Sequence, residues 1–386
     1  MNTPAPKVFD SFNRTDGSPK RNTESDFCFY NRSARAEIKK VRDLIEDYVE
    51  NYPNEELKEL IPRLRSGDDV HFRSASFELF LHEALRKLGF TLTPHPELPN
   101  GSLSRPDFLV SGTDGQCFYL EAVLATENNE LDKSGEVIKG VVLDTLTKVP
   151  HDNFMIEIDD EGSPQSSPSG KKLKTRVHAW LDALDPDEIL KKIDRSGFDS
   201  IEPMVWSYED WHLEIRPIPL KPERRGKSTT LIGISSLEVS YIDASGPIRD
   251  AIKFKGGKYG DLEIPLVVAV NLDSFELDRI DEMQALFGQE EFVFKSESDV
   301  EPEMRRAPNG AWHGKNGAQS KRVSAAWIFN DLHALSLAIG NSTIYVNPWA
   351  TLPAPETLKL FPFAETRNGK MQWHEGLSFR EIFELH

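Results

Sequence analysis

The clearest alternation of hydrophobic and polar positions lies between residues 74 and 125. In residues 74–88, SASFELFLHEALRKL, apolar side chains recur at helical spacing, and Gly89 follows as a typical helix end. Two later apolar runs, RPDFLV and CFYLEAVLA, are joined by SGTDGQ, whose Asp114–Gly115 pair is a strong hairpin signal. The second run is apolar on both faces, which predicts a central strand. A helix beside an antiparallel hairpin is therefore expected at the centre of the fold.

The same patterns extend through most of the chain. Helical spacing is found at 34–50, 54–66, 131–149, 178–193, 247–257 and 276–288. Strand-like runs are found at 90–98, 153–158, 211–220, 229–242, 266–270, 321–329 and 341–348. Residues 159–174 and 295–321 have the composition of loops. This mixture predicts an α/β (α+β) protein with a mixed sheet flanked by helices.

The order of these elements suggests five regions. They are a flexible arm at 1–30, a helical preface at 31–70, a core at 71–158 completed by 247–273, an insertion or second α+β region at 159–246, and a C-terminal α+β region at 274–386.

Composition narrows the class of protein. Hydrophobic residues make up 38% of the 386 residues, which fits a globular protein, and no apolar run is long enough to cross a membrane. The polar N-terminus has no apolar signal region, so we expect a cytoplasmic protein. Cys28 and Cys117 are too few for a disulfide framework or a structural zinc site. The net charge of −17 argues against simple electrostatic binding of nucleic acid.

Three acidic residues around the predicted hairpin are the candidates for chemistry. Asp107 and Glu121 stand on adjacent strands, so their side chains can converge on one ion. Glu121 interrupts an apolar face and would be costly to bury without a partner. On a helical wheel Glu78 borders the apolar stripe, whereas Glu83 points to the solvent side. His82, one turn from Glu78, is interpreted as an ordinary half-exposed histidine.

Carboxylates in this arrangement suit a hard divalent cation. Mg²⁺, or Mn²⁺ in its place, takes oxygen ligands and retains waters that a phosphate can partly displace. Such an ion lowers the pKa of a bound water and neutralises charge on a scissile phosphate. Asp107 and Glu121 are the predicted metal ligands. An Asp that caps a strand and a Glu paired with Arg are the structural alternative, which we expect in about half of such cases.

A lysine on the apolar face of a later helix is the second signal. Lys255 shares a face with Ile248, Ala251 and Ile252, and Gly256–Gly257 is expected to end the helix. Lysine is seldom buried without a partner, although a lysine in a last turn can also reach water.

Pro106–Asp107, a spacing of thirteen residues and Glu121 resemble the PD-(D/E)xK nuclease superfamily. The resemblance covers about residues 74–158, extending to 247–271, and implies a restriction-endonuclease-like core of a helix, three strands, a helix and a strand. It also implies metal-dependent hydrolysis of nucleic acid, most naturally DNA, with Glu78 as an additional acid. The pattern ELFLHEAL…HPELP…RPDFLV…FYLEA further resembles bacterial proteins of unassigned function.

The chain departs from that superfamily at Val123, which stands where the motif lysine is expected. Either the lysine has migrated, with Lys255 first and Lys139 and Lys258 next, or the protein is a catalytically inactive binding or scaffold protein. A lysine ammonium within about 4 to 6 Å of both carboxylates would favour the enzyme, and Glu121 held by an arginine would favour the scaffold. Hydrolysis of a small phosphate ester is left open.

Cations on predicted loops are the candidates for contacts with nucleic acid. Lys171, Lys172, Arg224 and Arg225 are the expected nucleic-acid-binding residues, followed by Lys174, Arg176, Arg305, Arg306, Lys321 and Arg322. Charge runs on loops are usually solvated, which is the alternative interpretation of these residues. Sequence specificity, the choice between DNA and RNA, and a homodimer as the oligomeric state are not determined by these patterns.

Overall fold

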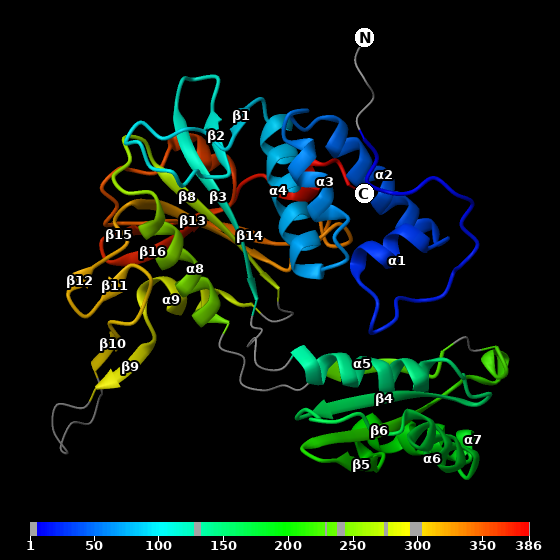
Figure 1. Ribbon diagram of the computed structural model, residues 1–386. Coiled ribbons are helices and arrows are strands. Elements are labelled where there is room, and N and C mark those ends of the chain that lie inside the picture. The colour runs from blue at the N-terminus through cyan, green and yellow to red at the C-terminus, as the bar shows by residue number, and fades with distance from the viewer. Residues whose placement is uncertain are drawn as a thin grey trace. The chain divides into compact units, whose positions relative to one another are not determined.

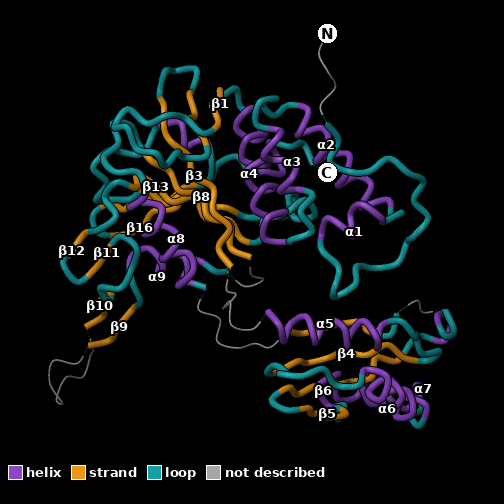
Figure 2. Tube along the Cα trace, viewed as in Figure 1, coloured by secondary structure: helices purple, strands orange, loops and turns teal. Residues whose placement is uncertain are grey.

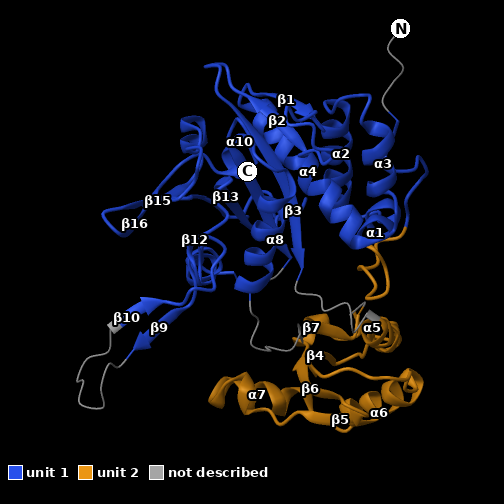
Figure 3. Ribbon diagram, turned by 60° about the vertical axis from the view of Figure 1, so that its left-hand side comes forward, with its two compact units in different colours: residues 1–15, 26–127, 243–386 blue, residues 16–25, 128–242 orange. Residues whose placement is uncertain are grey.

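The computed structural model describes residues 6–126, 133–227, 230–237, 244–273, 277–293 and 303–385. The chain divides into two compact units (Figure 3). Unit 1 contains residues 1–15, 26–127 and 243–386, and unit 2 contains residues 16–25 and 128–242. The α/β class expected from the sequence is confirmed, since helices and mixed sheets occur together in the described residues.

Unit 1 begins with four helices (Figure 1), namely α1 (Asp26–Arg32), α2 (Ala36–Glu50), α3 (Leu57–Leu64) and α4 (Asp69–Lys87). Its later helices are α8 (Ser245–Lys258), α9 (Arg279–Phe287), α10 (Phe379–Ile382) and the short 3₁₀ turn η4 (Glu356–Leu360). The strands of its main sheet are β1 (Thr91–Pro94), β2 (Phe108–Ser111), β3 (Cys117–Thr126), β8 (Leu266–Asp273), β13 (Val323–Asn330), β14 (Ser342–Val346), β15 (Phe363–Arg367) and β16 (Lys370–His374). Two small ribbons are formed by β9 (Glu290–Val293) with β10 (Glu303–Arg306), and β11 (His313–Gly314) with β12 (Gly317–Ala318).

The main sheet places β3 next to its centre. Among the described residues the strand order is β1-β2-β3-β8-β13-β14-β15-β16. The strands β1, β2 and β3 are antiparallel, whereas β3, β8 and β13 run parallel. β3 is hydrogen-bonded on both sides, and Phe118, Tyr119 and Leu120 are buried on its two faces, whereas Val123 and Leu124 are half-buried.

Helices cover both faces of this sheet. Phe118 and Leu120 of β3 belong to the core cluster that contains Phe77 and Leu81 of α4, so α4 packs on that face. The next residue, Glu121, points to the opposite face and bonds to α8. Figure 2 shows α2, α3 and α4 grouped together beside the sheet. Side chains of β3 therefore alternate between the face covered by α4 and the face covered by α8.

Helix α4 is the most enclosed of the N-terminal helices. It starts at Asp69, five residues earlier than the pattern predicts, because the Asp68 side chain accepts hydrogen bonds from the N–H groups of Val70 and His71. Glu83, expected on a solvent face, is only 1% exposed and bonds to Arg86. The expectation was wrong because α2 and α10 also pack on α4. A wheel with one apolar stripe does not describe a helix that is covered on several sides.

The expected flexible arm at 1–30 is corrected by the structure where it is described. Val8 and Phe9 are buried, and Phe27, Phe29 and Tyr30 add further rings to the same core cluster. The polar composition of this stretch conceals these few large apolar residues, which are enough to pack it. Residues 1–5 lie outside the described residues.

Unit 2 is a smaller α/β body built around a four-stranded sheet. Its elements are α5 (Lys133–Thr147), β4 (Phe154–Glu161), α6 (Gly170–Asp182), α7 (Pro186–Ser196), η2 (Phe198–Ser200), β5 (Met204–Tyr208), β6 (Trp211–Pro219), η3 (Pro222–Arg224) and β7 (Ile232–Leu237). The strand order is β5-β6-β4-β7. Apolar residues of α5, α6, β4 and β6 form a core separate from that of unit 1.

The boundaries of unit 2 correct the expected domain division. The sequence assigned 131–158 to the core of the first domain, but α5 and β4 belong to unit 2 because β4 pairs with β6 and β7. Helix α6 also begins inside the expected loop at 159–174. The predicted insertion therefore starts near residue 128 and not at 159.

Several other predicted segments differ from the structure. The expected loop at 295–321 contains β10, β11 and β12, and its part before residue 303 lies outside the described residues, as do residues 131–132, 229, 238–242 and 276 of other predicted elements. The C-terminal tail, which has no clear pattern, forms β15, β16 and α10. No helix in the described ranges has the length and apolarity needed to cross a membrane.

Two glycines in unit 1 allow a direct test of the backbone geometry. Gly288 has φ +98°, and a Cβ there would lie 1.9 Å from the carbonyl oxygen of Ala307, whereas Gly317 has φ +90° and a Cβ there would meet no atom within 4 Å. We expect Gly288→Ala to lower the free energy of unfolding by at least about 3 kcal/mol and Gly317→Ala by about 1 kcal/mol. Urea unfolding of both variants measures the difference. Equal losses would contradict the close approach at Gly288.

Candidate functional site

The site is organised around Glu121 on β3. Its carboxylate is 1% exposed and receives hydrogen bonds from the Lys255 ammonium on Oε1 and from the Tyr259 hydroxyl on Oε2. Lys258 adds an ion pair, with its Nζ 3.6 Å from Oε1. Burial and the charge of Glu121 raise the pKa of Tyr259, so this hydroxyl remains a proton donor. The buried charge predicted to need a partner has three, all from α8 and its end.

Helix α8 brings these donors together because it runs further than expected. Gly256 and Gly257 do not end it, and the helix continues to Lys258 with Tyr259 as its C-terminal cap. Lys255 and Tyr259 are four residues apart and so share one face. Gly256 also allows close packing, since a Cβ there would meet Val323 Cγ2 at 2.8 Å. The sequence does not single out Tyr259, because the glycine pair predicts a helix end before it; its spacing of four residues from Lys255 is the signal that relates the two.

Asp107 lies on the same side of the hairpin as Glu121. Phe108 pairs with Leu120 in the β2–β3 register, and extending this register by one position places Asp107 opposite Glu121. One oxygen of Asp107, Oδ2, accepts a hydrogen bond of 2.6 Å from the N–H of Ala122. Its other oxygen has no hydrogen-bond partner within the described part of the chain. The hairpin therefore holds the two predicted metal ligands side by side.

The electrostatic environment of Asp107 favours a proton or a cation. Burial, followed by the carboxylates of Glu121 and Glu78, raises the pKa of Asp107 to about 8, and the N–H of Ala122 and the charge of Lys255 act in the opposite direction. A divalent cation beside Asp107 and Glu121 would relieve the repulsion between these carboxylates. The hydrogen bonds from Lys255 and Tyr259 also leave about two of the roughly four lone-pair positions of Glu121 unused. Asp107 and Glu121 therefore fit a hard cation that completes its shell with water.

Glu78 approaches from α4 but is held differently. Its carboxylate is 5% exposed and accepts hydrogen bonds of 2.7 Å from the Tyr52 hydroxyl and from Nη1 of Arg63. Glu78, Asp107 and Glu121 are not among the described groups of three whose ligand atoms all lie within 4.8 Å of one another. Glu78 raises the pKa of Asp107 through its charge, yet both of its oxygens are already bonded. Neither Tyr52 nor Arg63 had a signal in the sequence, because both are joined to Glu78 only by tertiary packing.

His82 is buried rather than half-exposed as expected. Burial lowers its pKa to about 4, so the ring is neutral at neutral pH. Its ring centroid lies 4.7 Å from that of Tyr52, and its Nδ1 has no partner among the described residues. The helices around α4 cover this position, as they cover Glu83. His82 therefore acts as packing for Tyr52 in this structure.

A different group satisfies the distance criterion for a metal site. The ligand atoms of Glu56, Glu59 and His95 lie within 4.8 Å of one another, with His95 Nε2 3.9 and 3.8 Å from the two carboxylates. Glu59 is largely exposed, and the contacts are also those of ion pairs with a protonated histidine. These residues, which lie at the start of α3 and just after β1, were not selected from the sequence.

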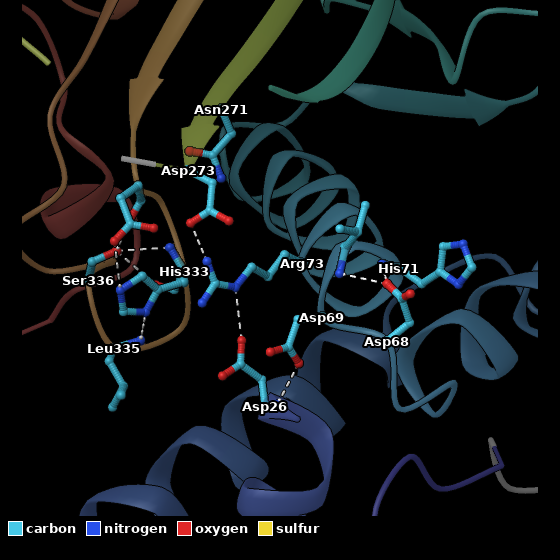
Figure 4. Close-up of polar contacts among 12 residues, drawn as sticks. Asp26, Asp68, Asp69, His71, Arg73, Asn271, Asp273, His333, Leu335 and Ser336 are labelled. Carbon is cyan, nitrogen blue, oxygen red and sulfur yellow. Dashed lines mark hydrogen bonds and ion pairs between the residues drawn. The ribbon is translucent and has the colours of Figure 1, made fainter. Parts of the chain in front are cut away.

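A second polar cluster surrounds Arg73 of α4 (Figure 4). Its Nε donates to Asp26 Oδ2 at 2.9 Å, and its Nη1 donates to Asp273 at the end of β8. Burial raises the pKa of Asp273, and Arg73 opposes this rise. Nearby, Asn271 exchanges two hydrogen bonds of 2.8 Å with the backbone of Leu332. This cluster attaches α4 to α1 and to the end of β8, and so contributes to the position of Glu78 on the same helix.

The other predicted cations are divided between the two units. Lys171, Lys172, Arg224 and Arg225 belong to unit 2, and Arg225 bonds to Asp187 and to the Leu220 carbonyl. Lys139, a candidate for the migrated lysine, is also in unit 2, where it is buried against Asp160. Several of the remaining cations are paired with acids, as Arg305 is with Glu291 and Arg322 with Asp261.

Comparisons of the chain with models of protein families, with curated proteins and with solved structures found no match. The arrangement of residues in this structure is therefore the basis for any statement about function.

The raised pKa of Asp107 predicts a specific dependence of stability on pH. Its pKa is about 8 in the folded chain and near 4 in an unfolded one, so its contribution is complete below about pH 4 and is lost as the pH rises to 8. Relative to Asp107→Asn, the wild type should lose up to about 5 kcal/mol of unfolding free energy between pH 4 and pH 9.

Urea unfolding at a series of pH values without divalent ions measures this difference. Asp261→Asn is the control, because the Asp261 side chain is 95% exposed. Parallel pH curves for the wild type and Asp107→Asn would contradict the environment described for Asp107.

Proposed function

We propose that this protein hydrolyses phosphodiester bonds in nucleic acid, with DNA as the expected substrate, in a reaction that depends on Mg²⁺ or Mn²⁺. The observation that carries the proposal is the meeting of Lys255 with Glu121, 134 positions away in sequence, beside Asp107. Val123 occupies the position two residues after Glu121, where the motif lysine is expected. The Lys255 ammonium of α8 contacts the Glu121 carboxylate in its place.

The order of elements around the site supports the same proposal. The chain runs through α4, the meander β1-β2-β3, then α8 and β8, with β8 parallel to β3. This is the helix, three strands, helix and strand implied by the resemblance to PD-(D/E)xK nucleases. Unit 2 is inserted between β3 and α8, and it accounts for the long separation of Glu121 from Lys255.

Each residue has a definable task in such a reaction. Asp107 and Glu121 would hold the ion, which supplies a water of lowered pKa and neutralises charge on the phosphate. Lys255 can orient the attacking water and stabilise negative charge that develops in the transition state. Tyr259 keeps the Glu121 carboxylate in one orientation. Glu78 acts on the charge of Asp107 from the other helical layer.

The local charge is compatible with an anionic substrate despite the net charge of −17. Two carboxylates face three cations beside Asp107, whose pKa is raised mainly by burial. These charged groups are Glu78, Glu121, Arg63, Lys255 and Lys258. A bound divalent ion would add to this positive potential.

A catalytically inactive binding protein is the second candidate. It is favoured by the contacts of Glu121, whose charge is already balanced by Lys255, Lys258 and Tyr259 without an ion. In that case the protein would bind nucleic acid or another partner, and divalent ions would not produce cleavage.

Cleavage of plasmid and of labelled oligonucleotides with Mg²⁺ or Mn²⁺ distinguishes the two candidates. We expect metal-dependent cleavage by the wild type, and a loss of at least about 100-fold in Asp107→Asn, Glu121→Gln and Lys255→Met. Lys253→Met is the matched control, because Lys253 is exposed on the same helix. Cleavage that persists in both carboxylate variants would refute the assignment, and binding without cleavage by the wild type would favour the inactive protein.

A further inference from the structure

Arg63 of α3 stands beside the candidate site in a fixed orientation. Its Nη1 donates to Glu78 at 2.7 Å, and its Nη2 makes a longer contact of 3.4 Å with Ser74 Oγ. The buried Glu78 carboxylate is held from its other oxygen by Tyr52. The bond to Glu78 therefore restricts the rotamers of Arg63, a side chain that is usually flexible.

The guanidinium group retains hydrogen-bonding capacity. Arginine has five N–H donors, and the described contacts of Arg63 use two of them, which leaves 5 − 2 = 3. The side chain is 27% exposed, so a ligand can reach it, whereas the glutamate that anchors it is 5% exposed. An arginine needed only to neutralise Glu78 could be buried with it.

The charge of Asp107 also affects the pKa of Arg63. Burial alone would lower the pKa of Arg63, but the contacts with Glu78 and the charge of Asp107 outweigh this and raise it. The described contacts include no hydrogen bond between Arg63 and Asp107. The remaining donors of Arg63 are therefore not occupied by an ion pair with Asp107.

Arg63 and Lys255 approach Asp107 from different helical layers. Lys255 comes from α8 on the face of the sheet to which Glu121 points, and Arg63 comes from α3, which packs on α4 at the opposite face. A polynucleotide has a phosphate at every nucleotide, so cations on both sides of the acidic pair suit two successive phosphates. The planar guanidinium matches a phosphate with two parallel hydrogen bonds, which an ammonium group does not do.

We propose that Arg63 is a phosphate-binding residue that holds a phosphodiester group next to the one that is hydrolysed, and that Glu78 is its anchor and not a metal ligand. This inference rests on the proposed function and adds to it the residue that places a polynucleotide in the site. Glu78 orients Arg63 through the bond at 2.7 Å and thereby acts as a positioning residue.

Binding of a labelled DNA duplex to the full-length chain in Ca²⁺, and its cleavage in Mn²⁺, test the proposal. We expect Arg63→Gln to weaken binding at least tenfold and to reduce the slope of log affinity against log salt by about 1. Arg63→Lys keeps the charge next to Glu78, so it should fold normally, preserve the salt slope and weaken binding several-fold. Arg65→Gln, two positions along, is the control and should bind within twofold of the wild type.

The anchor role of Glu78 has its own readout. Glu78→Gln should raise the KM for DNA without raising the Mn²⁺ concentration for half-maximal cleavage, because Asp107 and Glu121 are the proposed ligands and loss of the Glu78 charge lowers the pKa of Asp107. A raised Mn²⁺ requirement would instead make Glu78 a metal ligand and overturn this part of the inference. Circular dichroism of each variant identifies any loss of folding.

The outcomes separate this inference from the function on which it rests. A wild type that cleaves DNA, with Arg63→Gln and Arg63→Lys both binding and cleaving within twofold of it, would overturn the role of Arg63 alone. A wild type that neither binds nor cleaves nucleic acid would overturn the proposed function, and the role of Arg63 with it.

Discussion

Burial of the Glu121 carboxylate is the constraint on which the site depends. A charged group at 1% exposure in a central strand is tolerated only where hydrogen bonds and opposite charges replace water. Lys255, Lys258 and Tyr259 supply these contacts, and all three come from α8 or its end. The position of α8 over the sheet is therefore coupled to one side chain of β3.

This coupling explains how the chain can hold a large insertion at this point. Unit 2 separates β3 from α8 in sequence, but it has its own sheet and its own apolar core. A unit that buries its own apolar surface does not need to contribute to the core of its host. The parallel pairing of β3 with β8 and the contacts of α8 with Glu121 then close unit 1 across the insertion.

The elements that could be predicted best from the sequence were those with a strong local pattern. The β2–β3 hairpin follows from Asp114–Gly115 and two apolar runs, and Gly115 has the positive φ of +83° that such a turn requires. Predictions failed where tertiary packing decides the outcome. Glu83 and His82 are buried because further helices cover α4, and β15 and β16 form from a tail without a clear pattern because a neighbouring strand, β14, is available for pairing.

The candidate site was predictable to a similar extent. Asp107 and Glu121 are opposite each other because the register of a hairpin is set locally. The thirteen residues between them therefore suffice to predict that the two side chains lie side by side. Lys255 could be selected as unusual on an apolar stripe, but only the sheet topology brings it to Glu121. Arg63 and Tyr52 could not be found from spacing at all. They reach Glu78 from another helix and a loop, and no periodicity relates these positions.

The arrangement also implies that protons, cations and lysine compete for the same carboxylates. Burial, and then the charges of Glu121 and Glu78, raise the pKa of Asp107 and favour its protonated form, whereas a metal ligand must be deprotonated. Cation binding would therefore release a proton and strengthen as the pH rises towards 8. An ion bound to Glu121 would share that carboxylate with Lys255. Because Lys255 and Lys258 already offset the charge of Glu121, the site can remain folded without a metal ion, and a bound ion would then compete with these lysines for the carboxylate.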